Sequence, residues 1–153
     1  MKKCLGLVMV LGLVLALGNV AMAADSADVS VTANVVGTCR FQSTPTLDFG
    51  DLDQTVGTDA TTTGDLVFWC TRNAAYTLSD EGNVGVADGS FSGNLANGPE
   101  TIPYSISYTN FSGNGSGRTV PITSALTATI LNADYVDAPE GVYNDVVTFT
   151  ITP

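Results

Sequence analysis

The chain has 153 residues, with five lysines and arginines against 15 aspartates and glutamates, no histidine, and a formal net charge of −10. A chain this acidic is a poor partner for nucleic acid or for an anionic membrane surface. The absence of histidine excludes histidine general bases, Ser-His triads and imidazole metal ligands, so we expect no enzyme activity, no metal site and no cofactor.

The first 23 residues are typical of a secretion signal. Two lysines precede the apolar residues 5–17, and residues 21–23 (Ala-Met-Ala) fit the small-residue cleavage pattern. We expect the mature chain to begin at Ala24 and to meet a membrane only transiently, during export; an uncleaved membrane anchor is the alternative. Cleavage would remove both lysines, leaving three arginines against 15 carboxylates and enough chain for one domain.

The segment after the signal, residues 24–36, contains a strand pattern with one face suited to burial. Its apolar side chains alternate with mostly polar ones, at Val29, Val31, Ala33 and Val35. The last residues, 146–153, form a second such pattern. Open strand edges at the two ends would favour pairing between molecules. Alternation alone fits equally a first strand that pairs within its own chain, because it does not identify the core that buries the face.

Two cysteines, Cys39 and Cys70, remain after processing, since Cys4 leaves with the signal. An even pair in an exported protein is normally oxidised, so we predict one disulfide. Closing a loop of this length stabilises a fold by about 3 to 4 kcal/mol on the chain-entropy account. A redox or metal pair is disfavoured, because the spacing is not C-x-x-C and no further soft ligand is present.

Short strand patterns recur through the rest of the chain, while a helical period of 3.6 is not found. We predict strands within residues 66–70, 74–78, 102–108 and 120–130, and loops at residues 50–64, 82–98 and 110–117. Pro103 predicts that its strand begins late or lies at an edge. Repeated short strands separated by turns favour a two-sheet sandwich over one core.

Acidic residues gather in the first of these loops. Asp48, Asp51, Asp53 and Asp59 could suggest a calcium site, but the glycine and the closing acid of a calcium loop are out of place. A carboxylate pair for glycoside hydrolysis is a second alternative. Solvated surface acids are the preferred interpretation.

Four stretches resemble the landmarks of a known family. They are residues 37–39 (Gly-Thr-Cys), 47–50 (Leu-Asp-Phe-Gly), 67–71 (Val-Phe-Trp-Cys-Thr) and 139–150, which contain G-x-Y-x-D-x-V-x-x-T. In this order they resemble the spore coat protein U domain family, the family of the archaic chaperone-usher pilins. The middle of the chain departs from the family, because residues 104–117 lack its tryptophan-glycine motif.

This resemblance implies an all-β, incomplete immunoglobulin-like sandwich, residues 37–153, completed by the N-terminal donor strand of a neighbouring subunit, residues 24–36. The donor side chains would be Val29, Val31, Ala33 and Val35. One wall of the acceptor groove would be formed by Val147, Phe149 and Ile151.

The resemblance also implies a function and a set of partners. The chain would be a structural subunit of a pilus, exported through the periplasm to the cell surface as a fibre that serves attachment or biofilm formation. Its partners would be identical or related pilin subunits, a periplasmic chaperone and an outer-membrane usher. The alternatives are a secreted module that binds carbohydrate or a surface, and a structural protein of a spore or outer coat.

Overall fold

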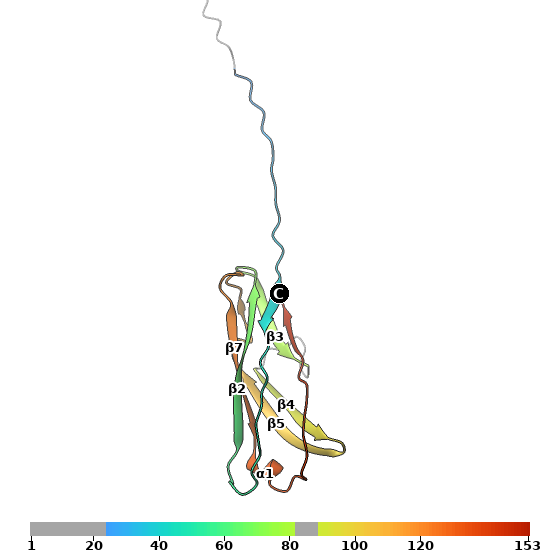
Figure 1. The fold of residues 1–153 in the computed structure, drawn as a ribbon. Helices are drawn as coiled ribbons and strands as arrows, with labels where there is room; N and C mark the ends of the chain where they lie inside the picture. Colours follow the sequence, from blue (N-terminus) through green and yellow to red (C-terminus); the bar gives the residue numbers. More distant parts are fainter. Residues whose placement is uncertain (1–23, 82–88) are drawn as a thin grey trace, which may run out of the picture. The chain divides into compact units, whose positions relative to one another are not determined.

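Two β-sheets face one another across a shared apolar core in the computed structural model, which describes residues 24–81 and 89–153 (Figure 1). The larger sheet has five antiparallel strands, in the spatial order β1 (Cys39–Ser43), β2 (Ala60–Cys70), β7 (Ile122–Ile130), β5 (Glu100–Tyr108) and β4 (Ser90–Asn97). The smaller sheet consists of β6 (Ser112–Asn114), β3 (Ala75–Asp80) and β8 (Phe149–Thr152). The predicted all-β class is confirmed.

The core is built by strict alternation along the central strands. On β5 and β7 every second side chain is buried, beginning at Ile102 and at Ser124, as expected for strands with one face against a core. Ser124 is a polar member of this buried face, and its hydroxyl donates a hydrogen bond to the carbonyl oxygen of Thr109. That bond removes the cost of burying an unpaired hydroxyl.

Some predicted boundaries are wrong. β2 begins at Ala60, inside the predicted loop 50–64, and β4 occupies residues predicted as the loop 82–98. The inward positions of β4 are Phe91, Gly93, Leu95 and Asn97, all of them half-buried, and only two carry an apolar side chain, so the sequence of β4 carries a weak hydrophobic signal. The third predicted loop contains the short strand β6.

Pro103 lies in a strand that is internal to the sheet, between β7 and β4. The β5–β7 ladder starts only at Ser105, while Pro103 is paired with Asn94 of β4. Pro103 therefore lies in the first half of β5, which is paired with β4 alone and has a free edge on its other side. The prediction that Pro103 lies at an edge is correct for this half of the strand and wrong for the strand as a whole.

Both terminal strand patterns give less strand than predicted. Residues 24–38 have no regular secondary structure, so the strand predicted within residues 24–36 is not formed in a single copy of the chain. The final strand is limited to β8, and residues 146–148 lie outside its ladder. Alternation supplies a face for burial, but a strand also requires a hydrogen-bonded neighbour.

The predicted signal, residues 1–23, lies outside the described residues. Within residues 24–81 and 89–153, no helix has the length and apolarity needed to cross a membrane; α1 (Asn132–Tyr135) has four residues.

Candidate functional site: an apolar groove between two sheet edges

β1 and β8 are edge strands of different sheets, and they lie beside one another in the fold (Figure 1). A cavity of about 370 Å³ opens between the chain that follows β1 and the chain that precedes β8. Its floor is formed by side chains of the larger sheet, namely Leu66, Tyr104, Ile106, Leu126 and Ala128. We call this cavity the edge groove.

The two walls of the edge groove come from distant parts of the sequence. One wall contains Phe41, Pro45, Leu47 and Phe49. The other contains Val146, Val147 and Phe149. The groove therefore reaches apolar residues of the core through a gap between two sheet edges. Groups at such a gap could bind an extended apolar segment.

The edge groove continues into a wider depression of about 1040 Å³. The two hollows share Thr46, Leu47, Phe49, Leu95 and Asp145. At its far end the depression is lined by residues 50–55 and 138–144. An occupant could thus extend beyond the apolar part of the groove.

Gly64 of β2 allows the first wall to approach the sheet. A Cβ atom at this position would lie 2.6 Å from Cβ of Pro45 and 3.0 Å from a methyl carbon of Leu47. Any larger residue at Gly64 would push this wall outward. The sequence offered no signal for this contact, because Gly64 ends a predicted loop and the residues that it contacts are 17 to 19 positions earlier.

The second wall is fixed by a hydrogen bond from β5. The phenol of Tyr104 donates to a carboxylate oxygen of Asp145 at 2.8 Å. Burial of the phenol, together with this bond to Asp145, raises the pKa of Tyr104 well above its ordinary value. Next along the chain, Asn144 forms two backbone hydrogen bonds with Ala96 of β4, of 2.9 and 3.1 Å. The final segment is thus anchored just before it enters the groove wall.

The residues predicted as an acceptor wall do not all lie in the groove lining. Val147 and Phe149 line it. Ile151 lies farther along β8, paired with Leu78 of β3 and packed against the core. The sequence analysis missed Tyr104 and Asp145 as a pair, although Asp145 belongs to the quoted G-x-Y-x-D motif.

The residues predicted as donor side chains are exposed. Val29, Val31 and Val35 have exposed fractions of 83%, 89% and 80%, and Ala33 is also exposed. Isolated exposed valines are common on protein surfaces, but three valines and an alanine at alternate positions would form one apolar face if the segment were a strand.

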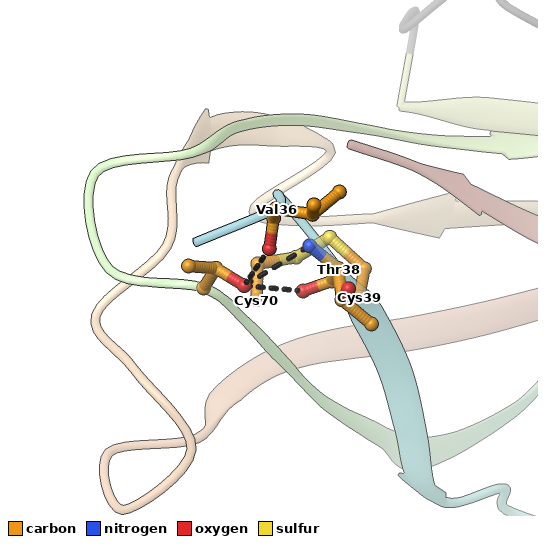
Figure 2. Close-up of a disulfide and its surroundings, with 5 residues drawn as sticks. Val36, Thr38, Cys39 and Cys70 are labelled. Carbon is orange, nitrogen blue, oxygen red and sulfur yellow. Dashed lines mark hydrogen bonds between the residues drawn. A yellow bond between two sulfur atoms is a disulfide. The ribbon is translucent and has the colours of Figure 1, made fainter. Parts of the chain in front are cut away.

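A disulfide secures the start of β1, as predicted (Figure 2). Cys39 and Cys70 are directly opposite in the β1–β2 ladder. Thr71 extends this attachment toward the N-terminus. Its hydroxyl accepts a hydrogen bond from the Thr38 N–H at 3.0 Å and donates one to the carbonyl oxygen of Val36 at 3.3 Å. The chain that leads into β1 is therefore held against the end of β2.

Three of the acidic residues considered as a calcium site accept hydrogen bonds from backbone N–H groups. Asp53 accepts from the backbone N–H and the hydroxyl of Thr55, at 2.8 and 2.7 Å, and these bonds lower the pKa of Asp53. Asp48 accepts from the N–H of Gly50, and Asp59 from that of Asn132. In the part of the chain that the structure describes, no three acidic or thiol side chains converge as a metal site would need.

Comparison with known proteins identifies the family of this chain and a related solved structure. Residues 25–150 match the family model of the Spore Coat Protein U domain. A matching solved structure is the crystal structure of the CsuC-CsuE chaperone-tip adhesion subunit pre-assembly complex from archaic chaperone-usher Csu pili of Acinetobacter baumannii, at 18% identity and a TM-score of 0.48. The match covers 76% of this chain and 40% of that chain, so it spans well under two thirds of the latter. A search of curated proteins found no match.

Proposed function

This chain belongs to the Spore Coat Protein U domain family, and from that premise we propose that it is a structural subunit of an extracellular fibre in which each copy fills the edge groove of the next. The resemblance predicted from the four sequence landmarks is confirmed by the family match. The observation that supports the mechanism most strongly is the groove itself, which lies between two unpaired strand edges and is lined by Leu66, Ile106 and Leu126 of the core.

The proposed occupant of the groove is residues 24–36 of another copy. Its side chains Val29, Val31, Ala33 and Val35 would enter the groove, and its backbone would pair with the open edge of β8. Burial of three valines and an alanine is worth about 5 to 9 kcal/mol of apolar transfer, before any backbone hydrogen bonds are counted. Assembly would then stabilise the fold of every subunit.

The attachment at Thr71 supports filling by a second copy over filling by the chain's own segment. Gly37 lies against Pro153, which follows β8, so residues 24–36 of the same chain would have to run parallel to β8 and reverse sharply into β1. The bonds of Thr71 to Val36 and Thr38 hold the chain where that reversal would occur. A segment from another copy has no such constraint.

We infer that other proteins cover the edge groove before assembly. An open apolar groove favours aggregation of the free subunit. A periplasmic chaperone that inserts a strand would prevent this, and an outer-membrane usher would present subunits to one another. Attachment or biofilm formation at the cell surface is the proposed role of the finished fibre.

Charge insertion on one face of the N-terminal segment tests the mechanism. We expect Val31→Asp, alone or with Val35→Asp, to abolish the ladder of multimers that wild-type fibres give on an unheated denaturing gel, because a carboxylate cannot be buried in the groove. Thr32→Asp and Ser30→Asp are matched controls, since they add the same charge to the opposite face of the segment. A ladder that persists in the double valine variant would disprove the exchange mechanism.

A further inference from the structure

Hydroxyl side chains form a regular array on the outward face of the five-stranded sheet. They occupy the solvent side of the three central strands, opposite the buried positions that build the core. The strand registers align them in two rows, Thr61, Thr129 and Ser105 in one and Thr63, Thr127 and Ser107 in the other. On β4, Ser92 extends the first row, because it pairs with Ser105. We call the six residues of the central strands the hydroxyl array.

Sheet geometry sets the spacing of this array. Neighbouring strands lie about 4.8 Å apart, and side chains two residues apart on one strand are separated by roughly 6.7 Å. Each hydroxyl can both donate and accept hydrogen bonds. Five of the six residues are exposed, and Thr129 is half-buried. An array of this kind, fixed to a rigid element, matches a partner that also presents hydroxyl groups.

The same face is almost free of charge, although the chain as a whole carries a net charge of −10. Among the outward positions of the five strands, only Arg40 and Asp65 are charged, and their charges cancel. The acidic remainder of the molecule would repel an anionic partner. A neutral partner meets no such barrier at this face, and no charged side chain must be desolvated over the array.

An aromatic side chain lies on the same side of β2 as the array. Trp69, the single tryptophan of the chain, is partly exposed there, and Val67 lies between it and Asp65 among the outward positions. From Thr61 to Trp69 the strand extends about 26 Å. An indole ring offers an apolar face together with an N–H donor, which suits the apolar face of a sugar ring.

We propose that this face binds a neutral polysaccharide, with sugar hydroxyls on the hydroxyl array and a sugar ring against Trp69. The site is independent of the edge groove, because it is on the opposite side of the larger sheet from the core. It would place a binding function on every subunit of a fibre.

The test measures retention of the full-length protein on cellulose, starch and cross-linked dextran, with alginate as an anionic comparison. We expect retention on at least one neutral polymer, and at least a tenfold weaker retention for Thr63→Lys, Thr127→Lys and Trp69→Ala. Ser112→Lys is the matched control: it adds the same charge at an exposed hydroxyl position of a strand in the other sheet. Unchanged thermal midpoints would show that the lysine variants remain folded.

Three results would overturn the proposal. They are no retention on any neutral polymer, equal retention by the two threonine variants and the wild type, and a lysine effect confined to association between copies. The multimer ladder separates this site from the proposed assembly mechanism, because Thr63→Lys and Thr127→Lys leave the edge groove untouched and are expected to give a normal ladder.

Discussion

Tyr104 brings a buried phenol into the lining of the edge groove. Its ring packs closely over Gly93, and its hydroxyl reaches Asp145 across 41 positions of sequence. A hydrogen bond to an ionised acceptor contributes about 1.5 to 3 kcal/mol. We expect Tyr104→Phe and Asp145→Asn each to lower the free energy of unfolding, and the double variant to lose less than the sum. Chemical denaturation of the four proteins gives the coupling energy; strict additivity would contradict a direct interaction.

The raised pKa of Tyr104 also predicts a dependence on alkaline pH. Above the ordinary tyrosine pKa of about 10, the unfolded chain loses the phenolic proton while the folded chain keeps it. The unfolded state then binds fewer protons, so the free energy of unfolding falls as the pH rises through this range. Below it, this group contributes no slope. Tyr104→Phe should therefore lose less free energy of unfolding than the wild type between pH 9 and pH 11. An equal loss in the two proteins would contradict the raised pKa of Tyr104.

Gly115 lies where no side chain fits. Its N–H donates to Ala74 and its carbonyl accepts from Asn73, both at 2.8 Å, and an added Cβ would collide with the carbonyl oxygens of Thr71 and Cys70. We expect Gly115→Ala to cost roughly 1 to 3 kcal/mol of stability, or more. Gly37→Ala is the control, because a Cβ at Gly37 meets Ala74 at an ordinary 3.5 Å. The thermal midpoints of the Gly115→Ala and Gly37→Ala variants are compared. Equal midpoints would show that the chain around Gly115 can relax to accommodate a Cβ atom.

At the level of whole strands, the disulfide connects the edge strand β1 to the interior of the larger sheet through β2. Replacing Cys39 and Cys70 together by alanine should cost about 3 to 4 kcal/mol, since the unfolded chain regains the entropy of the open loop. Urea unfolding of the variant, and of the wild type with and without reductant, measures this difference. A reductant effect on the variant itself would point to some other thiol.

The strands that sequence alone predicts are those with a full apolar face. β5 and β7 alternate without interruption from Ile102 to Tyr108 and from Ser124 to Ile130, so their faces could be assigned correctly. β4 could not, because Gly93 and the half-buried Phe91 and Leu95 supply too little hydrophobic contrast. Its place in the sheet depends on pairing with β5, which is a tertiary effect.

The candidate site shows the same division. The family resemblance predicted Val147 and Phe149, which line the groove, because they belong to a recognisable terminal motif. The opposite wall depends on the contact of Pro45 and Leu47 with Gly64. The hydrogen bond that fixes the second wall depends on the contact of Tyr104 with Asp145. Periodicity reports which face of a segment is buried, but it does not report which distant segment covers it.

For the molecule as a whole, an open groove makes stability depend on what fills it. A synthetic peptide of residues 24–36, added to monomeric full-length protein at 100 times its dissociation constant, should add about 2.7 kcal/mol to the free energy of unfolding. The thermal midpoint should rise by several degrees. The same peptide carrying Val31→Asp is the control. An equal rise with both peptides would mean that the groove does not recognise the valine face.

The attachment of Val36, Thr38 and Cys39 to β2 has a mechanical consequence. In a fibre joined through residues 24–36, tension would enter each domain at the first residue of β1. There the covalent bond from Cys39 to Cys70 passes the load directly into an interior strand, so pulling cannot peel β1 from its neighbour. Single fibres stretched in an optical trap should unfold at a lower force after reduction of the disulfide. The extension curves of wild-type fibres should show no unfolding step whose length corresponds to the release of β1 alone.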